Sequence, residues 1–360
     1  MVKQIRIECV GRARSFGFLS IRKNTVSALS HQIGSAGLSR PFEELLVCPR
    51  DKQDLRCEGS HLVCAQGHRY AVVEGVPIML ISDAEQTHIE GTRALAIAES
   101  GDASSLAKFD LGPNDIAPFV RGTIGATNGG LYRYLVGTLT EYPIPSLRLP
   151  PGEDRAFLEL GCNWGRWCIA AARLGYQVVG IDPSLKSIRA ANRVATQLGV
   201  KATYIVADGR FLPFRDQTFD QVFSYSVLQH LSKENTRTAL AEVRRALRVG
   251  GSALVQLPNV FGVRCLYHQI RRGFREPHDF EVRYWRPSEL LAAFTAGIGP
   301  SALSVDGYFS LNVQPNDLRL LPRRYRAVVH ASEALRRMSA RIPILAKVAD
   351  SLYVSARRPN

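Results

Sequence analysis

Long hydrophobic runs are missing from this 360-residue sequence. No stretch approaches the roughly 18 to 20 consecutive apolar residues of a membrane-spanning helix, and the N-terminus lacks the apolar core of a secretory signal. The seven cysteines are an odd number, scattered from Cys9 to Cys265, unlike the paired framework of a small secreted domain. We therefore expect a soluble, cytoplasmic protein without a transmembrane segment, whose cysteines are reduced thiols or metal ligands.

Acidic residues are scarce at both ends of the chain. Residues 1–40 carry seven basic side chains and one acidic side chain, and residues 241–360 carry 19 basic and nine acidic, while the middle is nearly balanced. Such charge suits phosphate, an anionic membrane surface or an acidic substrate, and it also serves solubility alone. Residues 1–40 show no hydrophobic period and are predicted to be a disordered basic segment.

The rest of the chain divides by pattern. Residues 41–82 contain short β-like runs broken by Gly and charged turns, which predicts a small β-rich module, and residues 83–113 are polar and are interpreted as a linker with a helix near residues 94–99. Beyond Pro151, β runs alternate with helical patterns, which specifies an α/β fold with a parallel sheet covered by helices. The predicted strands are 156–160, 177–181, 202–206, 221–225 and 252–257.

A glycine turn follows the first of these strands. Gly161 and Gly165 allow the backbone to turn sharply and to approach a ligand closely, and Asn163 is a residue type that tolerates positive φ. A dinucleotide site would have glycine at the first, third and sixth positions of the turn, where this sequence has Gly161, Asn163 and Arg166. A nucleotide-like ligand other than NAD is therefore predicted above this turn.

Three acidic residues are predicted to converge there. Glu159 lies near the end of the first strand, Asp182 ends the second and can accept the two ribose hydroxyls, and Asp208 ends the third and can accept the adenine amino group. Because clustered carboxylates repel a pyrophosphate and attract positive charge, the pocket suits a cationic nucleoside.

Residues 156–258 resemble the class I S-adenosylmethionine-dependent methyltransferases. The likeness rests on the first motif, on Asp182 and Asp208, on the fourth-strand motif from Phe219 to Leu231, and on Arg248-Val249-Gly250-Gly251. It implies a Rossmann-like seven-stranded domain over residues 114–360, with a lid helix at 126–142 and substrate-side insertions at 259–286 and 311–347. It also implies S-adenosyl-L-methionine as cofactor, bound by Glu159, Gly161, Asn163, Gly165, Asp182, Ser184, Asp208, Gly209 and Ser224.

The groups that face the acceptor are predicted from their positions after the strands. His230, near Tyr225 and past the fourth strand, is a candidate to take a proton from the nucleophile, and packing of the next helix is its alternative role. Arginines beside aromatic residues after the fifth strand are candidates for a clamp on an anionic acceptor, or else an ordinary solvated helix: His268, Arg271, Arg272, Arg283 and Trp285.

The β-rich module has nearly the spacing of a zinc ribbon. Cys48 and Asp51 are followed, after a gap of 12 residues, by Cys64 and His68, and Zn²⁺ accepts all three residue types. Cys57 is an alternative ligand. The module resembles the tRNA-methyltransferase activator ribbon, although Asp51 stands where that family commonly has cysteine. Without a metal, the module is expected to persist as a packed β unit.

The favoured function is methyl transfer to a small-molecule or lipid-like acceptor. An RNA methyltransferase is the alternative that the basic ends support, although no RRM or KH signature accompanies them. A non-catalytic nucleoside-binding scaffold is the third. The basic segment with Arg323, Arg324, Arg326, Arg336, Arg337 and Arg341 is a candidate for peripheral contact with an anionic membrane.

Overall fold

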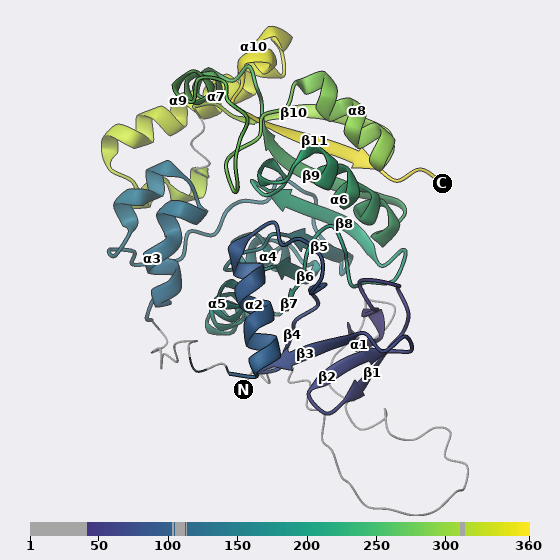
Figure 1. The fold of residues 1–360 in the computed structure, drawn as a ribbon. Coiled ribbons are helices and arrows are strands. Elements are labelled where there is room, and N and C mark those ends of the chain that lie inside the picture. Colours follow the sequence, from purple (N-terminus) through teal and green to yellow (C-terminus); the bar gives the residue numbers. More distant parts are fainter. Residues whose placement is uncertain (1–41, 103, 105–111, 113, 310–313) are drawn as a thin grey trace, which may run out of the picture.

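A computed structural model describes residues 42–102, 104, 112, 114–309 and 314–360. Residues 1–40, for which a disordered basic segment was predicted, lie outside the described residues, as does the start of the 311–347 insertion. The described chain forms a seven-stranded sheet and a smaller four-stranded sheet, with helices on both faces of the larger one (Figure 1).

The large sheet has the strand order β10-β11-β9-β8-β5-β6-β7. Strands β5 to β9 pair in parallel, and β11 is antiparallel to both of its neighbours, β9 and β10. The strands are β5 (Ala156–Leu160), β6 (Gln177–Asp182), β7 (Thr203–Val206), β8 (Phe219–Tyr225), β9 (Leu247–Pro258), β10 (Ser301–Gly307) and β11 (Ser351–Arg357). The predicted α/β class and Rossmann-like seven-stranded sheet are confirmed, and β9 begins five residues earlier than predicted.

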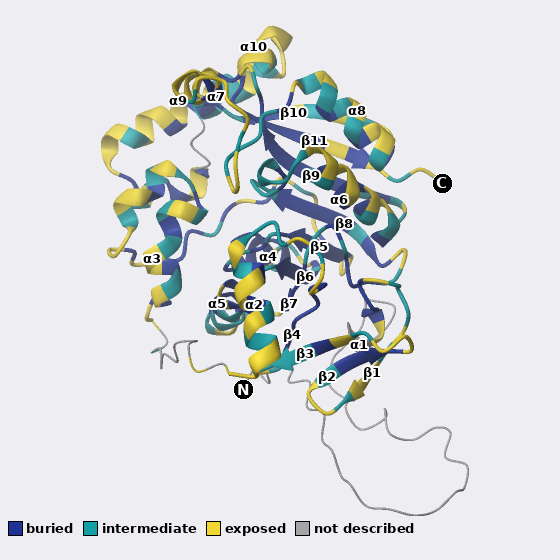
Figure 2. Ribbon diagram, viewed as in Figure 1, coloured by how far each residue is buried: buried dark blue, intermediate teal, exposed yellow. Residues whose placement is uncertain are grey.

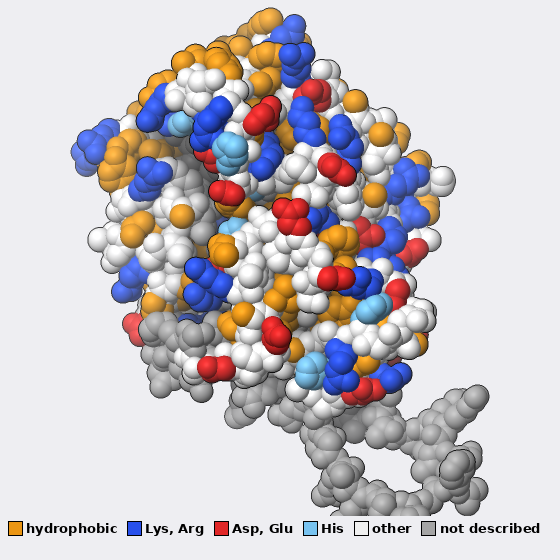
Figure 3. Space-filling model, in the orientation of Figure 1, with side chains coloured by type: hydrophobic (Ala, Val, Ile, Leu, Met, Phe, Trp, Pro, Cys, Tyr) orange, Lys and Arg blue, Asp and Glu red, His pale blue; other side chains and the backbone are white. Residues whose placement is uncertain are grey.

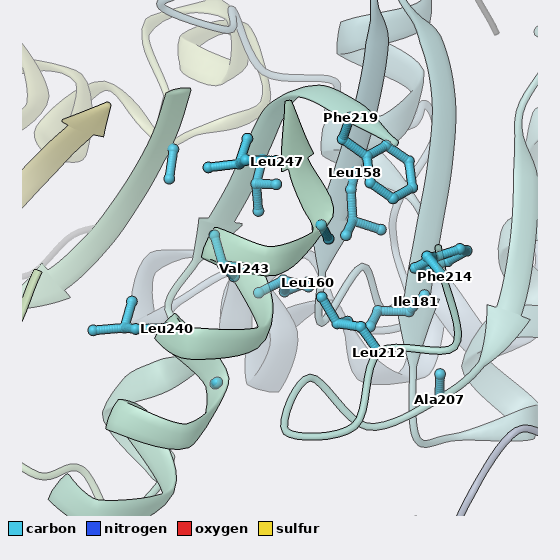
Figure 4. Close-up of a cluster of buried hydrophobic side chains, with 14 of the residues drawn as sticks. Leu158, Leu160, Ile181, Ala207, Leu212, Phe214, Phe219, Leu240, Val243 and Leu247 are labelled. Atoms are coloured by element: carbon cyan, nitrogen blue, oxygen red, sulfur yellow. The ribbon is translucent and has the colours of Figure 1, made fainter. Parts of the chain in front are cut away.

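Alternate residues of a strand point to opposite faces of the sheet, and a pair of helices covers each face. Phe157 of β5 packs with residues of α4 (Arg166–Arg173) and α5 (Leu185–Gln197). Leu158 and Leu160 point to the other face, toward α6 (Lys233–Ala246) and α8 (Pro287–Gly297). Figure 4 shows this second core, where Val243 of α6 lies near Leu160 of β5, and Figure 2 shows the strands buried between the helix layers.

The small β-rich module packs against the edge of the large sheet. It consists of α1 (Phe42–Leu45) and an antiparallel sheet of β1 (Leu55–Glu58), β2 (His61–Cys64), β3 (Arg69–Val73) and β4 (Val76–Pro77). After β4, Ile78 forms a parallel bridge with Val206, and the Met79 amide donates to the Val206 carbonyl at 2.7 Å. The module thereby covers the edge strand β7, which would otherwise expose unpaired backbone groups.

The predicted linker is more ordered than its composition indicated. Its helix α2 (Ile89–Ser100) is 12 residues long, and Ala94 is buried in the same cluster as α4 and α5. His88 caps α2 by accepting from the Glu90 amide at 3.1 Å. Residues 89–100 therefore belong to the folded body, and the helix predicted near residues 94–99 is present and longer than expected. Residues 103, 105–111 and 113 of the predicted linker lie outside the described residues.

The predicted lid helix also differs from the structure. An α-helix, α3 (Pro118–Thr127), comes first, and a 3-10 helix, η1 (Gly130–Leu135), follows it. Gly129 between them has φ 117°, a conformation that no α-helix contains. A single lid helix over residues 126–142 is therefore not present, since α3 ends at Thr127 and η1 ends at Leu135.

Helices α7 (Val263–Arg271), α9 (Arg323–Ser339) and α10 (Pro343–Val348) gather near the end of the sheet where β10 and β11 lie (Figure 1). The short 3-10 helices η2 (Leu228–His230) and η3 (Pro315–Leu320) complete the described helices. None of the helices in the described part of the chain is long and apolar enough to cross a membrane.

Candidate functional site

The turn between β5 and α4 adopts the left-handed conformation at three alternate residues. Gly161, Asn163 and Gly165 have φ values of 70°, 47° and 81°. A Cβ on Gly161 would lie 2.4 Å from Val227, and one on Gly165 would lie 2.6 Å from the Tyr204 hydroxyl. Both glycines are therefore required by backbone conformation and by space, and Asn163 takes the role that its residue type predicts.

A pocket opens above this turn. Its wall combines the glycine turn with the end of α3 and the end of β8: Thr127, Asn128, Glu159, Gly161, Cys162, Asn163, Trp164, Arg166, Trp167, Tyr225 and Ser226. The pocket thus lies at the carboxyl ends of adjacent parallel strands, where α/β folds commonly bind ligands.

Three buried polar atoms around this pocket have no hydrogen-bond partner among the described residues. They are Oε2 of Glu159, Nδ2 of Asn128 and Nε of Arg166. Buried polar groups are almost always paired in folded proteins, so unpaired ones lining a cavity point to a ligand that supplies the partner. Glu159 offers a hydrogen-bond acceptor to this pocket, and Asn128 and Arg166 offer donors. Such a set is complementary to a ligand that carries both an ammonium and a carboxylate.

Burial raises the pKa of Glu159 to about 8. Neighbouring Cys168 acts in the opposite direction through hydrogen bonding, and the negative charge of Asp182 adds to the rise. Without a cation, Glu159 is therefore largely protonated at neutral pH, and a cationic ligand would favour its ionised form.

Asp182 holds the turn. Its carboxylate accepts from the Asn163 amide at 3.0 Å and from the Ser184 amide at 2.9 Å. Burial raises its pKa to about 6, and the two amides counteract part of that rise. Ser184 in turn caps α5 by accepting from the Ser187 amide at 3.2 Å. Both residues lie next to the turn, and neither lines the pocket itself.

Asp208 is engaged by a neighbouring arginine. Arg210 contacts both of its carboxylate oxygens, with Nη2 to Oδ2 at 2.7 Å, and also donates to the Glu85 carbonyl. Asp208 therefore ties its loop to the segment before α2, and neither it nor Gly209 lines the pocket. Ser224 donates to the Leu160 carbonyl at 3.1 Å and links β8 to β5.

Tyr225 and His230 have different surroundings. Tyr225 lines the pocket, with Trp167 packed against its ring at 4.7 Å between centroids. His230 lies outside the pocket lining, stacked on Phe280 at 3.8 Å, with Nδ1 2.7 Å from the Phe280 carbonyl. Burial lowers the pKa of His230 to about 4. The catalytic role predicted for His230 stays a prediction, and the pocket geometry favours Tyr225.

The structure does not bring the five predicted substrate residues together. Trp285 is 1% exposed and belongs to the hydrophobic core. Arg283 donates to the His230 carbonyl at 2.7 Å, and Arg272 donates to the Val282 carbonyl at 3.1 Å, so both stabilise the insertion. His268 and Arg271 are exposed on α7. An anionic clamp made of all five residues is therefore not supported by their positions.

The sequence was compared with models of known protein families and with known proteins. A methyltransferase domain model matches residues 157–251, the segment that contains the glycine turn and β5 to β8. Residues 157–251 are a methyltransferase domain. They contain most of the parallel strands of the seven-stranded, Rossmann-like sheet described above.

Relatives of the methyltransferase domain include the ubiquinone biosynthesis O-methyltransferase of Brucella ovis, 29% identical over 158 residues. That match covers 40% of this chain and 60% of the relative. Among solved structures, phosphoethanolamine N-methyltransferase 2 of Haemonchus contortus in complex with S-adenosyl-L-methionine is 16% identical, with a TM-score of 0.43, covering 70% of this chain and 61% of that one. The YcgJ protein of Bacillus subtilis is 18% identical, with a TM-score of 0.40, covering 59% and 94%.

Arg166 and Asn128 of the pocket were missed by sequence reasoning. Arg166 of the methyltransferase domain is buried and pairs with Asp317 of η3 at 3.3 Å, and the Tyr132 hydroxyl donates to the same Asp317. The signal available in the sequence was an arginine directly after the glycine turn, because its burial is known only from the structure. Asn128 comes from the segment predicted as continuous helix, so its position next to the turn depended on the break at Gly129.

A second site lies in the β-rich module. The ligand atoms of Cys48, Asp51, Cys64 and His68 all lie within 4.8 Å of one another. Nδ1 of His68 is 3.0 Å from Asp51 Oδ2, 3.3 Å from Cys64 Sγ and 3.6 Å from Cys48 Sγ. Such separations fit four ligands around one tetrahedral ion at bond lengths of roughly 2.0 to 2.3 Å. The alternative ligand, Cys57, is exposed on β1 and does not belong to this cluster.

Proposed function

We propose that the chain is an S-adenosyl-L-methionine-dependent methyltransferase acting on a small-molecule acceptor. The observation that carries this proposal is the pocket above the glycine turn, with its unpaired carboxylate, amide and guanidinium atoms. Their chemistry fits the amino-acid end of the cofactor, whose ammonium would pair with Glu159 and whose carboxylate would pair with Arg166 and Asn128. The match of residues 157–251 to the methyltransferase domain supports the same conclusion.

The bound cofactor would supply an activated methyl group for in-line displacement. The chain contributes binding, orientation and exclusion of water, which are the main demands of such a transfer. Trp164 and Trp167 are almost completely buried beside the pocket, and they keep its inner wall apolar. Asp182 fixes the turn through two amides and is proposed to accept from the ribose, while Asp208 is proposed to accept from the adenine once it is released in part from Arg210.

The acceptor class is proposed as a small molecule. The curated relative is named for ubiquinone biosynthesis and supports a small acceptor only in general terms, because the match covers 60% of its length. The RNA alternative requires a basic surface that binds nucleic acid with strong salt dependence. The sequence contains no RRM or KH signature, so a small-molecule acceptor is preferred to RNA.

The decisive experiment follows labelled methyl groups. The purified chain is incubated with methyl-labelled S-adenosyl-L-methionine and, separately, with small-molecule extract and with total RNA from the producing cells. We expect label in the small-molecule fraction only, and none with an Arg166→Met variant. Label in RNA would replace the proposed acceptor class, and no label in either fraction would favour a non-catalytic scaffold.

We also propose that Cys48, Asp51, Cys64 and His68 bind Zn²⁺. All four residue types are accepted by zinc, and their mutual distances fit one tetrahedral ion. Cys48 and Cys64 belong to the same buried cluster as the core of the large sheet, so the ion would stabilise the packing of the module on the methyltransferase domain.

A further inference from the structure

A second pocket lies next to the first. Tyr225 lines both of them. The other walls come from residue 148 before β5, from the end of β10 and from α9: Arg148, Asp306, Gly307, Tyr308, Gln314, Pro315, Val329, Ser332, Glu333 and Ser351. This second pocket is therefore adjacent to the position where the cofactor is proposed to bind.

Asp306 is directed into this pocket by an irregularity in strand pairing. In β10, Val305 pairs with Leu352 and Gly307 with Ser351, so Asp306 is an extra residue in the ladder. Such bulges re-aim a side chain and are frequent next to active sites. Asp306 is 7% exposed.

Three donors surround the Asp306 carboxylate. Its Oδ2 accepts from the Tyr225 hydroxyl and from Ser351 Oγ, both at 2.8 Å, and its Oδ1 is 3.2 Å from Nη1 of Arg148. The chain of hydrogen bonds continues from Ser351 to Gln256 at 2.6 Å and from Gln256 to Ser226 at 2.7 Å. Ser226 lines the cofactor pocket, so this buried network connects the two pockets.

We propose that the second pocket binds the methyl acceptor by a hydroxyl group, and that the Tyr225–Asp306 pair takes up the proton this hydroxyl loses. The proposal rests on the proposed function. A hydroxyl acceptor must lose a proton, and the Asp306 carboxylate, reached through the Tyr225 hydroxyl that donates to it, is a base that can take that proton.

In the proposed transfer, the acceptor oxygen forms a bond to the methyl carbon as the bond between that carbon and the sulfonium sulfur breaks. The electron pair of the broken bond remains on sulfur, which becomes a neutral thioether. The acceptor proton passes to the phenolic oxygen of Tyr225 while the phenolic proton passes to Asp306. Tyr225 thereby acts as a catalytic residue, and Asp306 acts through it as a positioning residue.

The test compares Asp306→Asn and Tyr225→Phe with two control variants outside both pockets. Tyr176→Phe removes another buried phenol, which donates to the Pro150 carbonyl, and Asp220→Asn removes another paired carboxylate, which binds Arg248. Small-molecule extract from the producing cells and methyl-labelled cofactor are the probes, and mass spectrometry locates the label on oxygen or nitrogen. Calorimetry measures cofactor affinity separately.

We expect labelled ethers, with turnover reduced at least tenfold in Asp306→Asn and Tyr225→Phe and cofactor affinity within twofold of the unmodified chain. The two control variants should retain their turnover. Label on nitrogen, or unchanged turnover in Asp306→Asn, would overturn this inference while leaving methyl transfer intact. If the unmodified chain binds no cofactor, the proposed function itself fails.

Helix α7 has an apolar side that faces solvent. Val263, Leu266, Tyr267 and Ile270 are 41% to 58% exposed and follow the spacing of one helix face, and Phe274, just beyond the end of α7, is 64% exposed. The opposite side of α7 is anchored, because Asp350 accepts from the Arg264 and Cys265 amides at 2.7 and 3.0 Å. An amphipathic helix that presents its apolar face outward calls for a further surface to cover it.

Helix α10 extends this apolar face. Ile342, Ile344 and Val348 are exposed there, and Asn259, before α7, donates to the Lys347 and Ala349 carbonyls at 2.9 Å. Figure 3 shows orange side chains at the top of the molecule, where Figure 1 places α7 and α10. We call these eight exposed residues on or directly beside α7 and α10 the apolar face. Exposed basic residues lie on or directly beside the same two helices: Arg264, Arg271, Arg341 and Lys347.

We infer that the apolar face docks on an anionic membrane surface. Apolar side chains for the acyl boundary and a basic rim for anionic headgroups are the two features of an interfacial helix. From the sequence, the membrane contact was predicted for the basic segment of residues 323–341. The structure instead gives the apolar component to α7 and α10, and α9 contributes basic residues beside it. This inference does not depend on methyl transfer.

Vesicle sedimentation tests the inference with a matched control. The double variant Ile270→Glu/Phe274→Glu removes two members of the apolar face, and Ile89→Glu changes an equally exposed isoleucine on α2. We expect the unmodified chain and Ile89→Glu to sediment with phosphatidylcholine vesicles that contain phosphatidylglycerol. The amount of the double variant that sediments with these vesicles should be at least tenfold lower. No sedimentation, or equal loss in Ile89→Glu, would overturn it. A dimer abolished by the double variant would assign the face to a second copy instead.

Discussion

The Tyr225 hydroxyl donates to the Asp306 carboxylate at 2.8 Å, although the two residues are 81 positions apart. Tyr225 ends β8 in the methyltransferase domain, and Asp306 forms the bulge of β10 at the far side of the sheet. Because Ser351 of β11 also donates to Asp306, three strands meet at one carboxylate between the two pockets. The C-terminal part of the chain is thereby joined to the proposed cofactor site.

Cofactor binding is expected to release a proton. Burial raises the pKa of Glu159 to about 8, so the side chain is mostly protonated at pH 7, and a bound ammonium favours its ionised form. Calorimetry at pH 7 in buffers of different ionisation enthalpy should therefore show release of up to one proton. Glu159→Gln should abolish the release, while the exposed control Glu153→Gln should retain it. Buffer-independent heats for the unmodified chain would contradict this prediction.

The stability of the ligand-free chain should depend on pH through the same residue. The pKa of Glu159 is raised on folding, so the folded state binds this proton more tightly than the unfolded state does. The stabilisation is complete below the unfolded pKa of about 4.5 and is lost as pH rises toward about 8, with a slope of about 1.4 kcal/mol per pH unit. Urea unfolding at several pH values should show a smaller decline in Glu159→Gln. An identical decline in both proteins would assign the effect to other groups.

Gly165→Ala should destabilise the chain by about 1 to 3 kcal/mol, because it combines a strained positive φ with overpacking against Tyr204. Gly199→Ala is the matched control, since Gly199 has φ 64° and no atom within 4 Å of an added Cβ. Gly199→Ala should lose less stability than Gly165→Ala, because only backbone strain acts at residue 199. Equal losses in urea unfolding would show that the space above Gly165 does not matter.

Asp182→Ala should weaken cofactor binding by about 1.5 to 3 kcal/mol, because the charge-assisted bonds that hold the Asn163 and Ser184 amides disappear. Asp216→Ala, an exposed acid outside the pocket, is the control. Calorimetric affinity is the measurement. If both variants bind as the unmodified chain does, Asp182 has no part in the cofactor site.

Purified chain should carry one zinc ion. Elemental analysis is expected to find one equivalent of zinc, and Cys64→Ser should lose it together with thermal stability, because the ligand set becomes incomplete. Cys57→Ser should retain both, since Cys57 lies outside the cluster. A chain without zinc whose melting temperature is unaffected by zinc addition would show that the module packs without a metal.

The parts of the fold with a strong local signal could be predicted from the sequence. Alternating β runs and helices gave the parallel sheet, and the glycine spacing located the turn at Gly161 and Gly165. The lid region could not be predicted, because Gly129 and Gly130 interrupt a pattern that otherwise favours helix. The partnership of Asp306 with Tyr225 depends on a strand bulge and on long-range pairing, neither of which leaves a local pattern. Likewise, burial of Trp285 beneath Lys233 is a tertiary property that an aromatic-rich segment does not disclose.

The most direct test of the central claim is a crystal structure of the chain grown with S-adenosylhomocysteine. We predict ligand density above the Gly161–Gly165 turn, with the ammonium near Glu159 and the carboxylate near Arg166 and Asn128. Density at another place, or a pocket still filled only by solvent at saturating ligand, would contradict the account.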